Sequence, residues 1–124
     1  MKKPKLLGIA PQLVVQDTVR TAEYYRDVLG FKIIAYFDNP PVYAMVERDG
    51  FQIHFAKADT DAANTNETIR KGSTDFIIWV PEIDTFFEEL KSKNAHIVQE
   101  IIPRSYGREF IFQDCNGYKI MVCD

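Results

Sequence analysis

The stretch DTVRTAEYYRDVLGFKI, residues 17–33, contains a helix start, a helix stop and the beginning of a strand. Asp17 and Thr18 both suit the position that caps a helix, and Gly30 suits the position that ends one. The spacing therefore predicts a helix over residues 18–29, followed by a strand over residues 31–38. Its expected buried stripe consists of Ala22, Tyr25, Val28 and Leu29.

The same order of elements returns in the second half of the chain. Residues 82–93 have apolar side chains at positions 83, 86, 87 and 90, the spacing of a second amphipathic helix. A short apolar run precedes each helix, at residues 6–16 and 75–80, and three strand-like segments follow each helix. Those segments are residues 31–38, 42–48 and 51–57 in the first half, and residues 96–102, 108–113 and 118–123 in the second.

The turns repeat as well. Asp49-Gly50 precedes the last strand of the first half and Asn116-Gly117 precedes the last strand of the second, and both are hairpin dipeptides. The order is therefore β-α-β-β-β, twice. We expect an α+β fold with two tandem βαβββ modules that form curled mixed sheets, each with one helix packed on it.

The modules are expected at about residues 6–58 and 73–124 of a single domain that spans residues 1–124, joined by a polar, flexible linker at residues 59–72. A unit of about 55 residues with one helix buries too little surface to be stable alone. Its helix covers only one face of its sheet. The other face must meet a second unit or a second chain.

Composition narrows the classes of function. Hydrophobic residues make up 46% and charged residues 27% of the chain, and the net charge is −3. This mixture is typical of a folded domain and argues against a nucleic-acid binder, which usually has a basic excess. No apolar run approaches the ~20 residues of a membrane span. Pro11 and Gln12 interrupt the apolar stretch near the N-terminus, so it is not interpreted as a signal peptide, and a cytoplasmic location is expected.

Strand alternation separates the side chains under each helix from those on the uncovered face. Residues 51, 53 and 55 are expected under the first helix. The uncovered faces should carry Ala10, Gln12, Val14, Gln52, His54, Ala56, Asp75, Ile77, Trp79, Lys119, Met121 and Cys123. Such a mixture of polar, aromatic and soft apolar groups suits a small-molecule groove, although burial against the second unit is the alternative. Tyr106, Tyr43 and Phe37 are expected near the mouth of the groove.

The repeated β-α-β-β-β pattern, with DTVRTAEYYRDVLGFKI in one half and YGREFIFQDCNGYKI (residues 106–120) in the other, resembles the glyoxalase/bleomycin-resistance/dioxygenase superfamily, also called vicinal oxygen chelate. The segment from Tyr106 through Phe110, leading into Asp114, most resembles the bleomycin-resistance branch. That resemblance implies a metal-free homodimer that binds a drug in two grooves between subunits and performs no chemistry.

The enzymatic branches of this superfamily use a metal, and the resemblance places their ligand positions on Ala10, His54, Asp75 and Met121. A divalent ion held by imidazole and carboxylate groups needs about three or four protein ligands. Ala10 offers no donor and Met121 offers only a thioether. His54 and Asp75 therefore remain as weak metal candidates, and no cofactor is expected.

His54 and Asp75 could instead form a hydrogen-bonded pair across the groove. Such a pair could act as a general base, or it could fix packing or bind a ligand, which is the interpretation we favour. The predicted ligand-binding residues are Gln52, His54, Asp75, Trp79, Tyr106, Arg108 and Met121.

The resulting hypothesis is a metal-free protein that sequesters an aromatic or cationic small molecule, such as an antibiotic. One alternative is a metal-dependent lyase or dioxygenase of the same superfamily with an atypical ligand set. The other is an interaction module whose groove takes a peptide.

Overall fold

The computed structural model describes residues 2–61 and 64–124. Within these residues, eight strands and three helices follow one another in the order β1, α1, β2, β3, β4, α2, β5, α3, β6, β7, β8. The helices are α1 (Thr18–Asp27), α2 (Asn66–Ile69) and α3 (Ile83–Ser92). The strands are β1 (Gln12–Val15), β2 (Lys32–Phe37), β3 (Tyr43–Arg48), β4 (Phe51–Lys57), β5 (Phe76–Trp79), β6 (His96–Arg104), β7 (Gly107–Gln113) and β8 (Lys119–Cys123).

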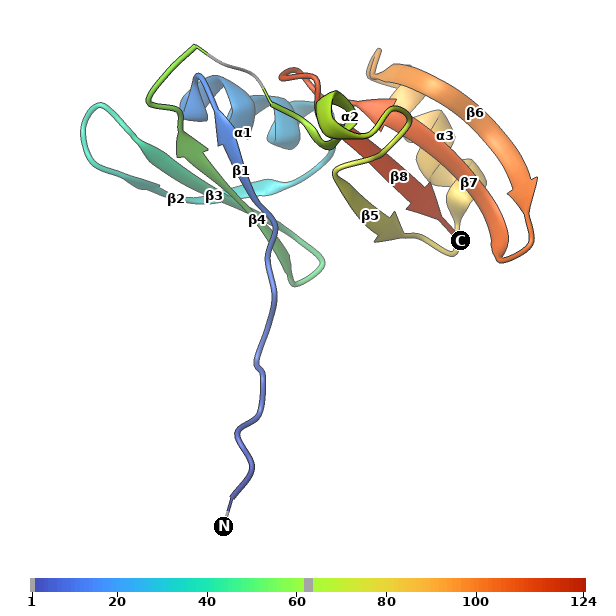
Figure 1. Cartoon of the computed structure of the whole chain (residues 1–124), viewed down its shortest axis with the longest axis horizontal. Helices are drawn as coiled ribbons and strands as arrows, with labels where there is room; N and C mark the ends of the chain where they lie inside the picture. The colour runs from blue at the N-terminus through green and yellow to red at the C-terminus, as the bar shows by residue number, and fades with distance from the viewer. Residues whose placement is uncertain (1, 62–63) are drawn as a thin grey trace.

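The strands form two four-stranded sheets with the same topology. The first has the order β1-β4-β3-β2 and the second has the order β5-β8-β7-β6 (Figure 1). In each sheet the first and last strands of the half are parallel neighbours, and every other pair is antiparallel. The expected fold class, two βαβββ modules with mixed sheets, is confirmed.

Helix α1 begins where the sequence offers a cap. The Asp17 carboxylate accepts a hydrogen bond from the Arg20 N–H at 3.0 Å, which decides between the two predicted capping residues. The helix ends at Asp27, two residues before the predicted end. Gly30 follows with a φ of 73°, a conformation that favours glycine and turns the chain into β2.

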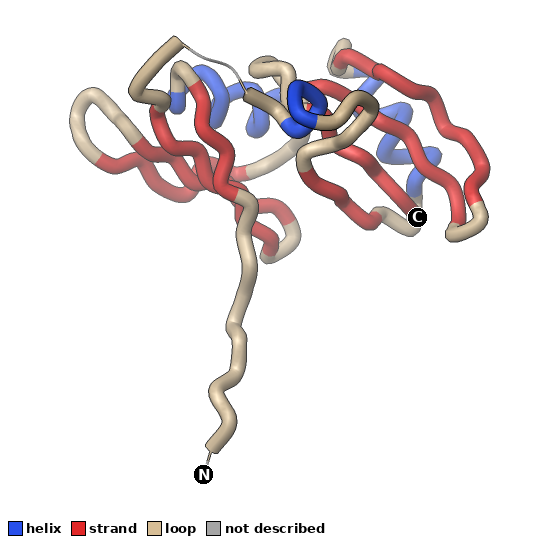
Figure 2. Tube along the Cα trace, viewed as in Figure 1, coloured by secondary structure: helices blue, strands red, loops and turns tan. Residues whose placement is uncertain are grey.

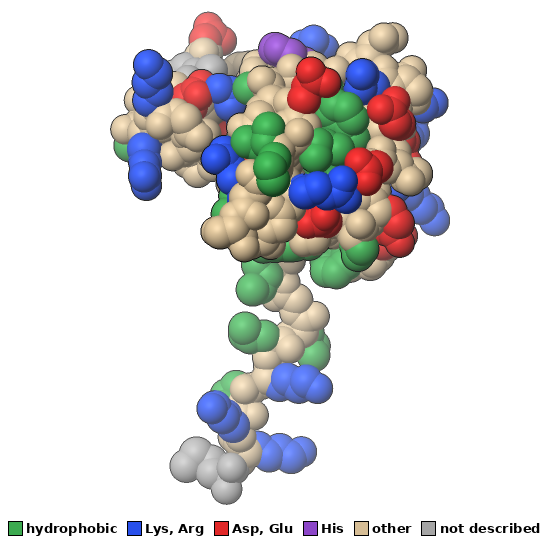
Figure 3. All heavy atoms as spheres, turned by 90° about the vertical axis from the view of Figure 1, so that its right-hand side faces the viewer, with side chains coloured by type: hydrophobic (Ala, Val, Ile, Leu, Met, Phe, Trp, Pro, Cys, Tyr) green, Lys and Arg blue, Asp and Glu red, His purple; other side chains and the backbone are tan. Residues whose placement is uncertain are grey.

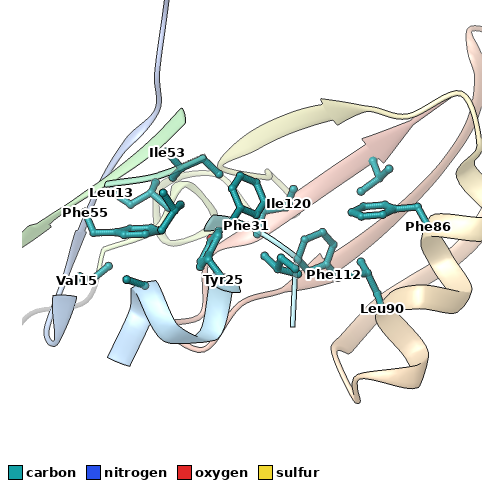
Figure 4. Packing of buried hydrophobic residues seen from close by; sticks show 14 of the residues in the cluster. Leu13, Val15, Tyr25, Phe31, Ile53, Phe55, Phe86, Leu90, Phe112 and Ile120 are labelled. Carbon is teal, nitrogen blue, oxygen red and sulfur yellow. The ribbon is translucent and has the colours of Figure 1, made fainter. Parts of the chain in front are cut away.

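The apolar faces of α1 and α3 pack into one core. All four predicted apolar residues of α3 are buried, as are Tyr25 and Leu29 of the first half. Figure 4 shows side chains of both halves in one continuous cluster, in which Tyr25 and Phe31 lie close to Ile120 and Phe112. Figure 2 shows α1 and α3 behind the strands, so both uncovered sheet faces lie on the side away from these helices.

Several polar contacts join the halves, and two of them connect charged or buried side chains. The Tyr25 hydroxyl, on α1, donates to the Asp114 carboxylate, at the end of β7, at 2.7 Å. The Arg48 guanidinium, on β3, donates to the Glu89 carboxylate, on α3, at 2.9 Å. The two modules are therefore connected by directional bonds as well as by apolar contact.

The described part of the linker expected at residues 59–72 contains one helical turn, α2. Two local expectations were wrong. The turn before β8 has three residues rather than two, because the Asp114 N–H donates to the Tyr118 carbonyl. Phe51 is 75% exposed, because it lies at the tip of the β3–β4 hairpin, beyond the reach of α1. The Asp49-Gly50 turn is confirmed as a two-residue hairpin, since Arg48 pairs with Phe51 and both turn residues have positive φ.

In the described part of the chain, no helix has the length and apolar content that crossing a bilayer requires.

Candidate functional site

The uncovered face of the first sheet, here called the His54 face, is ordered in rows by the strand register. Gln12, His54, Met45 and Ala35 form one row, with Gln52, Glu47 and Lys32 on one side of it and Val14, Ala56, Tyr43 and Phe37 on the other. Phe37 and Tyr43 stack edge to face with ring centroids 6.0 Å apart. The register therefore places both rings on the uncovered face; they were expected near the mouth of the groove.

A chain of hydrogen bonds crosses the His54 face from β1 through β3 to β4. The Gln12 side-chain amide donates to the Tyr43 hydroxyl at 2.9 Å, and that hydroxyl lies 2.7 Å from Nδ1 of His54. The other ring nitrogen of His54, Nε2, lies 2.8 Å from Oε1 of Gln52. Both nitrogens of the imidazole are therefore engaged by neutral partners on the same sheet.

The uncovered face of the second sheet, here called the Trp79 face, is apolar where β5 lies beside β8, whereas Lys119 at the start of β8 points to the same face and pairs with Glu67 of α2. Trp79 is paired with Cys123, and Ile77 is paired with Met121 in the next row. Ile111 continues that row on β7. Trp79 is 68% exposed, so most of a large flat ring faces solvent beside the apolar residues Ile77 and Met121. Figure 1 shows β5 at the free edge of this sheet.

A buried carboxylate lies on the Trp79 face, and the sequence analysis missed it. Glu109 is paired with Cys123 and is only 2% exposed. It accepts hydrogen bonds from the Tyr106 hydroxyl and from the Gln99 amide (3.0 Å), and Arg104 lies 3.4 Å away. Burial alone raises the pKa of Glu109, but the hydrogen bonds from Tyr106 and Gln99 and the charge of Arg104 hold that pKa below its ordinary value.

Strand alternation in β7 contained the signal for Glu109. Phe110 and Phe112 are buried beneath the helix, so residues 109, 111 and 113 must point to the uncovered face. The same alternation sends Arg108 to the helix side. There it donates to Asp84 of α3 at 3.2 Å and to Asp124 at 3.2 Å. The prediction that Arg108 lines the groove is therefore wrong in its placement.

Asp75 has a backbone role. Its carboxylate oxygens accept hydrogen bonds from the N–H groups of Asn66 and Lys119, both at 2.8 Å. These bonds connect the start of α2 to the start of β8. The expected pair with His54 does not form. The partners of Asp75 are the Asn66 and Lys119 amides, and the ring nitrogens of His54 contact Tyr43 and Gln52.

The remaining predicted residues separate into two groups. Gln52 and His54 lie together on the His54 face, whereas Trp79, Met121 and Tyr106 belong to the Trp79 face. Each face carries part of the predicted set, and the two parts have different chemistry. The His54 face is a neutral hydrogen-bonded strip, whereas the Trp79 face is aromatic and apolar beside a buried carboxylate, Glu109.

The positions that the family would use for a metal do not fit one. Ala10 has no donor, Met121 has a thioether, and His54 and Asp75 are committed to the partners described above. Within residues 2–61 and 64–124, no three side chains of His, Cys, Asp or Glu gather closely enough to hold an ion. A metal site built from imidazole and carboxylate groups needs three or four protein ligands, and these positions do not supply that number.

The sequence matches one protein family over almost its whole length. The profile described as Glyoxalase/Bleomycin resistance protein/Dioxygenase superfamily covers residues 7–122. A comparison with curated protein sequences finds no match.

Several solved structures share the fold at low sequence identity. A bleomycin-binding protein from bleomycin-producing Streptomyces verticillus, complexed with copper(II)-bleomycin, is 20% identical, has a TM-score of 0.74, and aligns over 98% of each chain. TioX from Micromonospora sp. ML1 is 18% identical with a TM-score of 0.73, over 93% of this chain and 95% of TioX. A fosfomycin resistance protein, FosX, from Listeria monocytogenes, complexed with Mn(II) and a dihydroxypropylphosphonic acid, is 15% identical with a TM-score of 0.67, over 96% of this chain and 90% of FosX. At these identities the likeness establishes the fold, and the binding and metal properties belong to the relatives.

Proposed function

Because the chain belongs to the glyoxalase/bleomycin resistance protein/dioxygenase superfamily, we propose that it binds a small or medium-sized aromatic or cationic molecule and acts by sequestering it. The exposed indole of Trp79 on an apolar sheet face is the observation that carries this proposal. A flat ring presented in this way suits stacking with a planar ligand or contact with a cation. Antibiotic binding is supported by the ligand of the S. verticillus relative.

Sequestration is favoured over metal-dependent catalysis by the donor set. Of the four family positions, Ala10 has no donor atom and Met121 has only a thioether. The His54 imidazole has both nitrogens engaged, and two backbone amides hold the Asp75 carboxylate. We therefore propose a protein that binds its ligand stoichiometrically and without a metal, so protection would scale with the number of protein copies.

A homodimer is part of this proposal. The His54 face and the Trp79 face both lie open, and a partner chain could bring the Trp79 face of one copy opposite the His54 face of the other. Each groove would then have one polar wall and one aromatic wall. Residues 2–10 support this arrangement, because this N-terminal arm extends away from its own sheets (Figure 1).

The side chains of the arm are apolar and exposed. Leu7 is 96% exposed, and Leu6 and Ile9 are also exposed. Figure 3 shows hydrophobic and basic side chains of the arm standing clear of the folded body. Apolar side chains in such a position lose contact with water favourably when a second surface covers them.

Deletion of residues 2–9 is expected to weaken the dimer at least tenfold, because the apolar contacts of the arm are lost while β1 is kept. Analytical ultracentrifugation over a concentration series measures the dissociation constant. A variant with Lys2, Lys3 and Lys5 changed to Ser is the matched control, since it keeps the apolar residues, and it should dimerise normally at moderate salt. An unchanged dissociation constant after the deletion would contradict the role of the arm.

The proposed function is tested with the intrinsic fluorescence of the protein. The sequence has one Trp, so the emission reports on the Trp79 face alone. Copper(II)-bleomycin and a set of planar aromatic compounds are titrated into the protein. A ligand should change the emission, saturate at about one molecule per chain, and be recovered unaltered by mass spectrometry. Conversion of the ligand would instead establish an enzyme, and near-stoichiometric metal in protein purified without chelator would contradict metal-free binding.

A further inference from the structure

The hydrogen-bonded strip of the His54 face has a fixed direction, and this direction determines what it presents to a ligand. A phenol hydroxyl has only one proton to donate. Because the Gln12 amide donates to the Tyr43 oxygen, the Tyr43 proton is free to be donated to Nδ1 of His54. When the ring of His54 has a single proton, Nδ1 accepts from Tyr43, and Nε2 carries the proton and donates it to Oε1 of Gln52.

Each end of this strip has one amide group left over. Gln52 uses its oxygen and keeps its NH2 group as a donor, whereas Gln12 uses its nitrogen and keeps its oxygen as an acceptor. No protein partner is recorded for either of these groups in the described part of the chain. Gln12 is an exposed residue, and among the described residues that are not exposed, which include Gln52, no buried side-chain nitrogen or oxygen lacks a hydrogen bond, so both free groups are accessible from solvent.

The strip is also close to electrically neutral. The ionisable groups in its nearest row are Glu47, paired in the register with Gln52, and Lys32, paired with Glu47. Their charges are opposite. The four residues of the strip carry no formal charge when His54 has a single ring proton. A neutral donor and a neutral acceptor are best matched by a neutral group that has one of each.

We propose that the His54 face recognises an uncharged amide-type group of the ligand, such as a carboxamide, a lactam or a ring amide. A carbonyl oxygen of the ligand accepts from Gln52, and an N–H of the ligand, on the same amide group or on another, donates to Gln12. Tyr43 and His54 act as positioning residues, because they hold the two glutamine side chains in register. The inference rests on the proposed function, since it specifies the chemistry of one wall of the same groove.

Three probes of nearly identical shape test this proposal: benzamide, benzoate and benzamidine. Benzamide offers one acceptor and one donor, benzoate offers only acceptors, and benzamidinium offers only donors. Binding is measured by NMR, using the side-chain amide signals of Gln12 and Gln52 and the single indole signal of Trp79. Benzamide is expected to bind at least tenfold more tightly than the other two, with the glutamine signals shifted.

Substitution of Gln52 supplies the second half of the test. Gln52→Glu replaces the free donor with a carboxylate, and should reverse the order so that benzamidine binds at least tenfold more tightly than benzamide. Gln16→Glu is the matched control, because it adds the same charge at a glutamine that instead bonds the carbonyl of Thr60, outside the strip. It should leave the order of the probes unchanged. If Gln52→Glu lowers the folded fraction, Gln12→Leu removes the acceptor and should weaken benzamide selectively.

The outcomes separate this inference from the proposed function. Equal affinity for the three probes, or the same response from Gln16→Glu and Gln52→Glu, would overturn the amide inference while the Trp79 signal still reported ligand binding. If no probe shifts the NMR signals of Gln12, Gln52 or Trp79, and the larger aromatic compounds cause no change either, the amide inference and the proposed function would both be overturned.

Discussion

Replacing Asp114 with Ala is expected to lower the free energy of unfolding by about 3–5 kcal/mol. Asp114 is only 5% exposed. One carboxylate oxygen accepts from the N–H groups of Asn116 and Tyr118, at 2.8 and 3.0 Å, and the other accepts from the buried Tyr25 hydroxyl at 2.7 Å. Alanine leaves all three donors without a partner and opens a gap between the modules.

Asp114→Asn is the matched control for this prediction. Its amide oxygen can accept from both backbone N–H groups, and its NH2 group can donate to the Tyr25 hydroxyl. It should therefore cost about 1 kcal/mol or less. Urea unfolding of both variants at neutral pH measures the difference. Equal losses in the two variants would show that the hydrogen bonds of Asp114 are not the source of its contribution.

The pH dependence gives a further expected result for the same pair. Burial is the main cause that raises the pKa of Asp114 above its ordinary value of 3.8. A raised carboxyl pKa in the folded state means that the charged form costs stability, so the cost disappears as the pH falls through the raised pKa and below 3.8. The stability of the wild type relative to Asp114→Asn should therefore increase on acidification, as measured by urea unfolding at a series of pH values.

Trp79→Ala is expected to weaken ligand binding by about 10- to 100-fold while the fold is retained. A ligand that stacks on the indole loses a large contact area, and buried aromatic anchors carry much of the affinity of such sites. Isothermal titration calorimetry measures the dissociation constant, since the fluorescent reporter is removed by the substitution. The thermal midpoint of the free protein should change little, because the side chain is 68% exposed.

Phe51→Ala is the control for Trp79→Ala. Phe51 is also an exposed aromatic residue, but it lies at the hairpin tip on the helix side of the strand alternation. Its loss should leave the dissociation constant unchanged. Similar weakening by both substitutions would indicate a general effect of surface hydrophobicity and would remove Trp79 from the proposed site.

Periodicity was sufficient to predict the architecture of this chain. The amphipathic spacing of α3, the Asp17 cap and the Asp49-Gly50 turn are local signals, and each depends on residues a few positions apart. The family resemblance was confirmed by the match over residues 7–122. The exact length of the turn before β8 was not predicted, because Asp114 bonds both sides of it and shifts the pairing by one residue.

The sequence predicted which residues lie on the uncovered faces but not which hydrogen bonds they form. Alternation placed Trp79, Met121, Gln52 and His54 on uncovered faces, because these strands have unambiguous apolar positions beneath the helices. The partners of each polar group depend on contacts between strands that are distant in sequence. Asp75 is held by backbone amides of two other segments, and Tyr43 reaches His54 from the neighbouring strand. No local pattern encodes such contacts.

The bonds between Tyr25 and Asp114 and between Arg48 and Glu89 have a consequence for how this duplicated chain tolerates change. Although the halves repeat one plan, neither can melt by itself without exposing the shared interior. A destabilising substitution in either half is therefore expected to lower the free energy of unfolding of the whole chain. We therefore expect the two halves to unfold as one cooperative unit even where their exposed faces have diverged.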